Sequence, residues 1–424
     1  MFRHASLHFA LAFTLALSAA PSRGEPVARI HELAQQEKAP LLDTLRDLID
    51  IESGSKDVEG LAKLAALIDE RLTKLGGKVE LIEPTEIYRM EDTPEKPGAM
   101  VHAEFKGTGS KRIMLIAHMD TVYLRGMLKD QPFRIDGERA YGLGIADDKQ
   151  GVALILHAVA MLQALKFADY GTLTVLINGD EEISSPGSRS TITRMAGEQD
   201  AVFSYEGGGM DGSLRLATSG IGSAYLTVDG KASHAGSAPD RGVNALVELS
   251  HQILQLSDLS RKEQGLTLNW TVSQAGTNRN VIPAHATAQA DARALKMSDF
   301  TGLEAALRQR AQTQRIADAR VQLKFEMRRP PLEATPRSRG LAAHGAAIYE
   351  ELGLPLKVLD VATGGGTDAA FAAIKTTAAV IEGFGLSGFG AHSNDAEYVR
   401  QETIVPRLYL SVRMIMDVSQ GKVK

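Results

Sequence analysis

The feature that most constrains the fold is a regular alternation of short apolar runs with longer helical patterns. Residues 112–117, 172–177 and 201–205 are apolar runs of strand length, and 150–165 is a long helical pattern. Short apolar runs are typical of buried strands, and strands alternating with helices indicate a mostly parallel sheet. We therefore expect an α/β fold with a mixed, mostly parallel sheet flanked by helices.

The pattern changes near residue 220, where segments follow one another in a different order. They are a strand over 223–228, a helix over 243–256, strands over 266–272 and 286–293, a helix over 300–312 and a strand over 321–327. This order is typical of a small two-layer α+β sandwich. The α/β pattern then resumes with a helix over 337–352 and a strand over 378–382. We therefore predict one domain formed by 25–219 and 331–424, with a second domain, 220–330, inserted into it.

The N-terminal segment indicates export. Arg3 precedes an apolar stretch over residues 7–20, which ends in small residues, with Ser18 and Ala20 spaced as at a cleavage site. This pattern is typical of a secretory signal peptide and is too short for a membrane span, although a buried N-terminal helix is the alternative. We predict a signal peptide over 1–24 and a periplasmic or secreted protein with no membrane span in the mature chain.

Composition narrows the chemistry. The 424 residues include no cysteine, so any metal site must use His, Asp and Glu ligands. The formal net charge of −5 provides no basic surface for nucleic acid, which we exclude as a partner.

Candidate metal ligands are found where predicted strands end. His118 and Asp120 directly follow the apolar run over 112–117. Ligands of open α/β sheets bind beyond the carboxyl ends of the strands. Residues two apart in an extended backbone point to the same side, so Asp120 can orient a metal-bound His118. Taken alone, this pair equally fits a surface turn.

Two runs of acidic residues lie further along the chain. Asp147 and Asp148 precede a predicted helix, where a carboxylate either caps the helix or bridges two cations through its two oxygens. Asp180, Glu181 and Glu182 close a predicted strand, and their mutual repulsion is relieved by a solvated turn or by a bound cation. In the second case, one carboxylate binds metal while its neighbour acts as general base.

Glu206 ends another predicted strand, and His392 lies in a glycine-rich loop. Each is ordinary alone. With His118, one Asp of the 147–148 pair and one Glu of the 180–182 run, they form a set of nitrogen and oxygen ligands suited to a two-zinc site.

Several motifs together resemble those of one enzyme family. They are His118-Met-Asp-Thr-Val122, Gly144-Ile-Ala-Asp-Asp-Lys149, Asp180-Glu-Glu182, Ser233-His-Ala-Gly236 and Gly365-Gly-Thr-Asp-Ala369. In this order they resemble the zinc aminoacylase/carboxypeptidase family, and most closely its glutamate carboxypeptidase (carboxypeptidase G) branch. The resemblance covers essentially all of the mature chain. It implies that 25–219 and 331–424 form the catalytic domain and 220–330 a lid and dimerisation domain.

The resemblance also implies roles for the candidate ligands. His118 and Glu206 would hold one Zn²⁺ and Glu182 and His392 the other, with Asp147 bridging the two. Asp120 would support His118, and Glu181 would be the general base that takes a proton from the bridging water. In this family the peptide bond between Asp147 and Asp148 is typically cis.

The resemblance also implies residues that bind the substrate. In related dimers the equivalent of His234 reaches the site of the partner subunit, and Asn280 resembles a position that faces the substrate carboxylate. Arg293 and Arg329 are weaker candidates for the same anion, which a guanidinium binds through two hydrogen bonds. The stretch around Arg215 lacks a clear match to the basic residue of the family pattern, although Arg215 itself can substitute for it.

We therefore predict a zinc-dependent exopeptidase that hydrolyses the amide bond to a C-terminal amino acid, glutamate in folate-type, peptidyl or N-acyl substrates. The alternatives are a related aminoacylase, a dipeptidase or an N-acyl-amino-acid deacetylase, with a non-catalytic binding protein as a remote further possibility. The resemblance implies two Zn²⁺ per subunit and a homodimer formed through the lid.

Overall fold

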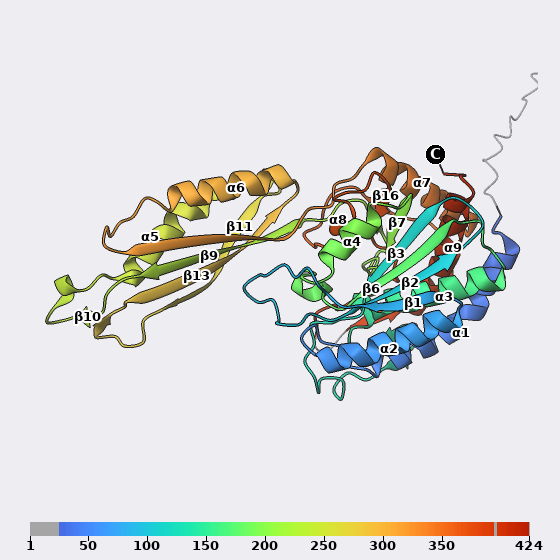
Figure 1. Ribbon diagram of the computed structural model, residues 1–424, viewed down its shortest axis with the longest axis horizontal. Helices are drawn as coiled ribbons and strands as arrows, with labels where there is room; N and C mark the ends of the chain where they lie inside the picture. The colour runs from blue at the N-terminus through green and yellow to red at the C-terminus, as the bar shows by residue number, and fades with distance from the viewer. Residues whose placement is uncertain (1–24, 394–396, 424) are drawn as a thin grey trace, which may run out of the picture.

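The computed structural model describes residues 25–393 and 397–423. Figure 1 shows them as a larger lobe and an elongated smaller lobe, which comprises residues 220–329. The predicted signal peptide over 1–24 lies outside the described residues. Among the described helices, none combines the length and apolar character needed to cross a bilayer.

The larger lobe is built on one sheet, which has six strands among the described residues. Their order is β1 (Lys78–Ile82), β2 (Met100–Lys106), β6 (Thr172–Asn178), β3 (Arg112–His118), β7 (Ala201–Ser204) and β16 (Ala379–Ile381). The last four run parallel to one another, whereas β1 and β2 are joined by antiparallel pairing. The predicted mixed, mostly parallel sheet is therefore confirmed.

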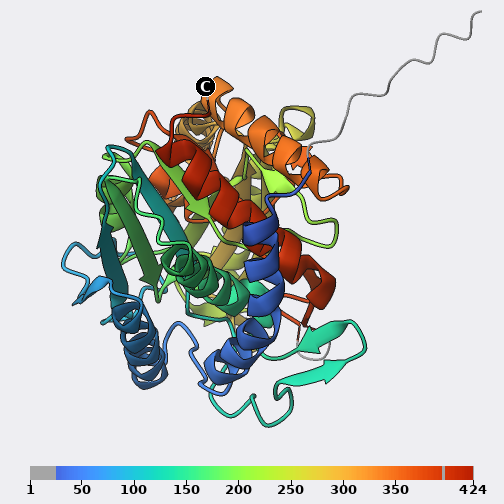
Figure 2. The ribbon, with the colours of Figure 1, turned by 90° about the vertical axis from the view of Figure 1, so that its right-hand side faces the viewer.

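Helices cover both faces of this sheet. One face packs against α1 (Ala28–Ile49), α2 (Val58–Lys74), α3 (Gln150–Ala164), α7 (Pro336–Glu351) and α9 (Ile404–Ser419), and the other against α4 (Arg189–Ala196) and α8 (Ala369–Ala372). Ile113 and Leu115 of β3 join the first core, while Met114 and Ile116 join the second. Figure 2 shows α1 and α9 side by side, although they come from opposite ends of the chain. The lobe thus has three layers.

Local sequence signals set the bounds of α2. The Asp57 carboxylate accepts a hydrogen bond from the Gly60 N–H at 2.9 Å and caps the first turn. Gly76 follows the last turn with φ of +84°, a left-handed conformation that favours glycine.

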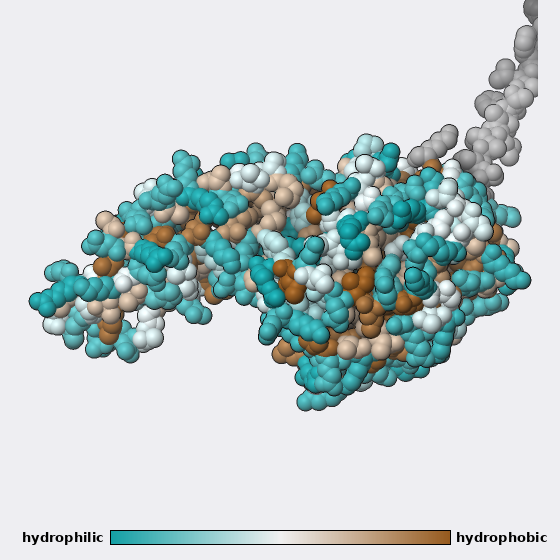
Figure 3. All heavy atoms as spheres, viewed as in Figure 1, coloured by the Kyte–Doolittle hydropathy of each residue, from teal (hydrophilic) through white to brown (hydrophobic). Residues whose placement is uncertain are grey.

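The smaller lobe is an antiparallel sheet covered on one face by two helices. The strand order is β11 (Thr267–Ala275), β13 (His285–Ala294), β9 (Gly220–Asp229) and β14 (Arg320–Arg329), and the helices are α5 (Ala245–Leu256) and α6 (Met297–Arg310). Every second residue of β13 from Ala286 to Ala294 is a buried alanine, which lets the helices pack closely. On the face shown in Figure 3, hydrophilic residues dominate the surface of this lobe.

The two lobes are joined by β9 and β14, which pair with each other. Ile221 of β9 lies opposite Arg329 of β14, close to the main sheet. The segment between β1 and β2 also contacts β14, because the Glu91 N–H donates to Glu326 at 3.1 Å and Arg328 pairs with Asp92 at 2.8 Å.

Short strand pairings support loops in both lobes. They are a sheet of β17 (Gly388–Phe389), β18 (Tyr398–Arg400), β5 (Arg139–Tyr141) and β4 (Arg134–Asp136), the pair β8 (Leu214–Arg215) and β15 (Val358–Leu359), and the pair β10 (Ser233–His234) and β12 (Val281–Ile282).

Candidate metal centre

Adjacent parallel strands place three acidic or imidazole side chains at one edge of the main sheet. His118 ends β3, Glu182 follows β6, and Glu206 follows β7. Since β6, β3 and β7 are neighbours, their carboxyl ends meet there. Loops bring Asp147, between β5 and α3, and His392, between β17 and β18, to the same place. The structure therefore gathers the ligands proposed from the sequence.

The distances divide these side chains into two groups that share one carboxylate. His118 Nε2 lies 3.0 Å from Asp147 Oδ1 and 3.4 Å from Glu206 Oε1. His392 Nε2 lies 3.2 Å from Asp147 Oδ2 and 3.0 Å from Glu182 Oε2. Asp147 thus faces one imidazole with each of its oxygens, so each oxygen is available to a different group of side chains.

The donor set fits metal ions. Glu182 Oε1 is buried and has no hydrogen-bond partner among the described residues, so one acceptor remains for a cation. Burial and the charge of Asp147 raise the pKa of Glu182 to about 7, because the carboxylates crowd one another. Hydrogen bonds to Asp147 and Glu182 raise the pKa of His392 to about 11. Burial would lower the pKa of His118, but Glu206 and the other nearby carboxylates raise it well above its usual value. Such an excess of negative charge is relieved by divalent cations.

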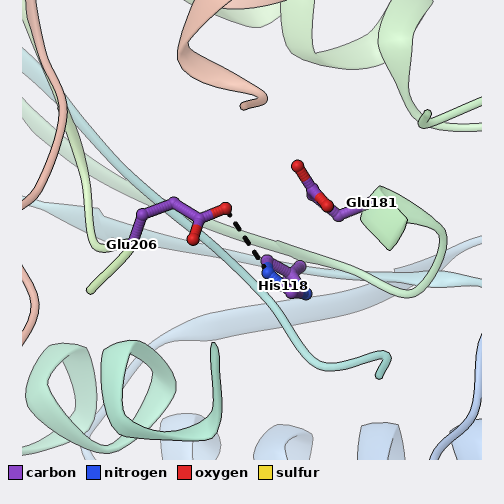
Figure 4. Close-up of side chains that lie close together, drawn as sticks. All are labelled: His118, Glu181 and Glu206. Carbon is purple, nitrogen blue, oxygen red and sulfur yellow. Dashed lines mark ion pairs between the residues drawn. The ribbon is translucent and has the colours of Figure 1, made fainter. Parts of the chain in front are cut away.

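Glu181 lies beside the first group. One of its oxygens lies within 4.8 Å of the facing atoms of His118 and Glu206, and Figure 4 shows it beside them. It forms a buried ion pair with Arg329, whose Nη2 also donates to the Glu181 carbonyl at 2.6 Å. Burial raises the pKa of Glu181 well above its usual value, and Arg329 opposes that rise. A buried carboxylate beside the candidate ligands is placed to accept and return a proton.

Asp120 fixes both His118 and the Glu181–Glu182 segment. The buried Asp120 carboxylate accepts hydrogen bonds from Ser55 Oγ at 2.7 Å, from the Glu181 N–H at 3.0 Å and from the Glu182 N–H at 3.1 Å. Its Oδ1 lies 3.3 Å from His118 Nδ1, so it orients the imidazole as well.

The Asp147 loop is held by a residue that sequence reasoning missed. The Glu397 carboxylate accepts from the N–H groups of Gly144, Ala146 and Asp147 at 3.0, 2.7 and 3.2 Å, and from Tyr123 Oη at 2.5 Å. The peptide bond between Asp147 and Asp148 is cis. Asp148 does not cap α3, which has no side-chain cap. No local signal in the sequence marks Glu397, because its partners lie about 250 residues away.

A cavity of about 550 Å³ opens beside this centre. Its walls include Asp147, Glu181, Glu182, Glu206 and His392 together with the guanidinium groups of Arg215, Arg293, Arg328 and Arg329. Arg293 also pairs with Asp291 at 2.9 Å, and Arg215 donates to the Gly207 carbonyl at 2.8 Å. A larger cavity of about 720 Å³ lies elsewhere and contains none of the centre's residues. The smaller cavity therefore combines the candidate ligands with cations that can hold an anionic substrate.

Two of the predicted residues lie far from this cavity. His234 is in β10 at the outer tip of the smaller lobe, and Figure 1 shows β10 at the far end from the main sheet. Asn280 lies beside it, since the Ala235 N–H donates to the Asn280 carbonyl at 2.9 Å. Within one chain, neither side chain joins the centre.

Comparisons with known proteins identify the family of the chain. Residues 114–417 match the family described as Peptidase family M20/M25/M40. Carboxypeptidase G2 of Pseudomonas sp. (strain RS-16) is 42% identical over 93% of this chain and 92% of its own. Two solved structures share the fold: aminopeptidase PepT from Bacillus cereus, with 22% identity, 90% and 98% of the two chains covered and a TM-score of 0.72, and the M20 family metallo-carboxypeptidase Sso-CP2 from Sulfolobus solfataricus, with 17% identity, 89% and 98% covered and a TM-score of 0.71.

The fold and the site together define a metal-dependent hydrolase. The chain belongs to Peptidase family M20/M25/M40. The predicted resemblance to zinc carboxypeptidases, closest to the glutamate carboxypeptidase branch, is confirmed, as is the predicted enzyme class of a metallo-carboxypeptidase-like hydrolase.

Proposed function

We propose that this peptidase removes a C-terminal glutamate from folate-type, peptidyl or N-acyl substrates. The observation that carries the proposal is the adjacency of two ligand groups, bridged by Asp147, to a cavity lined by several arginines. A glutamate product carries two carboxylates, and guanidinium groups are suited to hold them. The similarity to a carboxypeptidase over most of both chains supports the same reaction.

We assign His118 and Glu206 to one Zn²⁺, Glu182 and His392 to the other, and Asp147 to both. When bound, such a metal pair supplies an activated water and stabilises charge on the scissile carbonyl. Nitrogen and oxygen donors suit zinc, and the absence of cysteine from the sequence leaves no thiolate ligands.

The residues of this chain then perform the proton transfers and hold the substrate. Glu181 accepts the proton of the attacking water and returns it to the leaving amine. Arg329 keeps Glu181 in place, and Asp120 holds both Glu181 and His118. Arg293 and Arg215 line the cavity where the substrate carboxylates would lie.

His234 and Asn280 would act in a homodimer. Their place at the tip of the smaller lobe prevents them from reaching the centre of their own chain. We propose that they reach the centre of a partner subunit when the smaller lobes pair. Sedimentation velocity tests the dimer. Mixing inactive Glu181→Gln with inactive His234→Ala chains should restore up to about a quarter of the activity by statistical pairing, and no recovery from exchanged subunits would contradict shared sites.

We further propose that residues 1–24 direct export and are removed, giving a periplasmic or secreted enzyme. Expression of the full chain should give a mature protein that begins after Ala20 or Gly24, as N-terminal sequencing would show. An intact N-terminus in the cytoplasmic fraction would contradict this assignment.

A substrate panel tests the reaction. Aminobenzoyl-glutamate, folate and methotrexate should release glutamate rapidly, acetylornithine and dipeptides slowly, and a chelator should abolish all release. Preferential hydrolysis of dipeptides or acetylornithine would favour the related dipeptidases or deacetylases instead.

Replacement of Glu181 by Gln tests the base. The variant should keep its zinc content and lose roughly 10²–10⁴-fold in kcat. A zinc-loaded variant with full activity would contradict the assigned role.

A further inference from the structure

The cavity of about 720 Å³ that lies apart from the metal centre is formed where the two lobes meet. Met297 and Met327 line it from the smaller lobe, and residues of α4 and α8 line it from the larger lobe. Figure 1 shows α4 and α8 on the side of the larger lobe that faces the smaller one. A cavity of this size can enclose a small molecule, and a ligand bound there would contact both lobes.

One part of the cavity wall is apolar. Ile374 is 54% exposed, Met297 is 45% exposed and Tyr88 is 41% exposed, and all three line the cavity. Large apolar side chains that face water gain free energy when an apolar group covers them. The wall therefore favours a ligand with an apolar body.

The charged side chains of the wall are mainly cations. Arg189, Arg194 and Lys375 line the cavity, and none of them forms an ion pair with another described residue. Glu86 is the only acidic residue among the described residues of the wall. Because the cations outnumber the acid and are not paired, the cavity attracts an anion.

Arg189 is the half-buried member of this group, and its contacts are all neutral. Its Cζ lies 4.1 Å from the centre of the Tyr88 ring and 4.7 Å from that of Phe371. Its Nη2 donates to the Arg328 carbonyl at 2.7 Å and also to the Ser184 carbonyl. Burial lowers the pKa of Arg189 to about 10, and an anion bound beside it would offset this cost of burial.

We infer that the cavity between the lobes is an accessory site for an organic anion with an apolar body, such as an aliphatic carboxylate. The anionic group pairs with Arg189, Arg194 and Lys375, while the apolar body covers Met297 and Ile374. This cavity shares no lining residue with the cavity beside the metal centre, so the two sites can be occupied at the same time. The inference therefore goes beyond the proposed function and does not depend on it.

The first test separates the contributions of charge and apolar surface. Octanoate, octanol and acetate are titrated calorimetrically into the zinc-loaded wild-type protein. We expect octanoate to bind, octanol to bind about tenfold more weakly because it lacks the charge, and acetate to show no measurable binding. No binding of octanoate, or equal affinities for octanoate and either of the other compounds, would overturn the inference.

The second test locates the site. The double variant Arg194→Gln and Lys375→Gln replaces two exposed cations of the wall, and its affinity for octanoate should fall about fivefold. The matched control is Arg261→Gln with Lys129→Gln, because both residues are exposed and lie outside the cavity. The control should bind octanoate as the wild type does.

Equal affinities of the wild type and the Arg194→Gln and Lys375→Gln variant for octanoate would place the anion elsewhere, for example at the metal centre, and would overturn the inference. Release of glutamate is not measured in either test. Failure of the accessory site would therefore leave the proposed function untouched, and failure of the substrate panel would leave the accessory site untouched.

Discussion

Arg329 forms a buried ion pair with Glu181, and the pair joins the two lobes of the molecule. Arg329 ends β14 of the smaller lobe, whereas Glu181 follows β6 of the main sheet. The side chains are only 3% and 8% exposed. The proposed base therefore depends on a cation supplied from the other lobe.

Replacement of Arg329 by Ala should shift the acid limb of the kcat profile to higher pH. Arg329 opposes the burial that raises the pKa of Glu181, so its loss leaves the base protonated to a higher pH. Loss of one partner of a buried pair should also destabilise the fold by about 3–5 kcal/mol. Kinetics from pH 5 to 9 on zinc-loaded protein would measure the shift. Arg413→Ala, which breaks the pair with Glu351 far from the cavity, should lose stability without moving the pH profile.

Replacement of Asp120 by Ala should weaken zinc binding about 10–100-fold. The substitution removes the acceptor that orients His118 and holds the two N–H groups of Glu181 and Glu182. Competition with a zinc-binding dye would measure the affinity. Asp417→Ala removes another buried carboxylate and should leave zinc affinity close to that of the wild type. Equal affinities for the two variants would contradict this role of Asp120.

Removal of metal should lower the melting temperature, and added zinc should restore it. The carboxylates of Asp147, Glu182 and Glu206 converge, so cations that bind only the folded chain stabilise it, by about 2.7 kcal/mol at 100 times Kd. Mg²⁺ should be less effective, because it prefers oxygen ligands and this centre includes His118 and His392. Differential scanning fluorimetry after chelation would measure the shift, and the Glu182→Gln variant should show a smaller one. Equal melting temperatures with and without zinc would contradict metal binding here.

Lys149 should make stability depend on pH above neutrality. Burial lowers its pKa from 10.5 to about 7, and its Nζ donates to the Ile51 carbonyl at 2.7 Å. A lysine with a lowered folded-state pKa releases its proton on folding, so stability rises with pH between about 7 and 10.5. Relative to Lys149→Met, the wild type should therefore gain about 3 kcal/mol between pH 7 and 9.5. Urea unfolding of both proteins at pH 7 and 9.5 would measure this gain. If the free energy of unfolding changed by the same amount in the wild type and in Lys149→Met, Lys149 would keep its proton in the folded protein.

The strands of the main sheet and the residues that follow them could be predicted from the sequence. β3 and β6 are nearly continuous apolar runs because both of their faces are covered, and this signal survives without tertiary information. His118 and the Asp180–Glu182 run could be predicted as candidate ligands for the same reason, since parallel strands end at a common edge, whereas the choice of Glu182 within that run came from family resemblance. His392 has no such strand pattern before it, and its proposed role came from family resemblance.

Contacts between distant segments could not be predicted in this way. Glu397 holds the Asp147 loop by accepting hydrogen bonds from backbone N–H groups. Because a backbone N–H does not depend on the type of residue, such a contact cannot be predicted from a sequence pattern. α1 was also missed, because it includes Pro40 and many charged residues, and its burial depends on packing against α9 and α3. The placement of His234 at the outer tip required the lengths and directions of β9 and β13 as well as their order.

The chain enters and leaves the smaller lobe through β9 and β14, which are hydrogen-bonded neighbours. Because these two strands are hydrogen-bonded to each other, a change in the angle of the smaller lobe would move both of them together. Arg329 is the last residue of β14 and forms an ion pair with Glu181. A change in the angle of the lobe would therefore also change the contact between Glu181 and the cation that opposes the rise of its pKa.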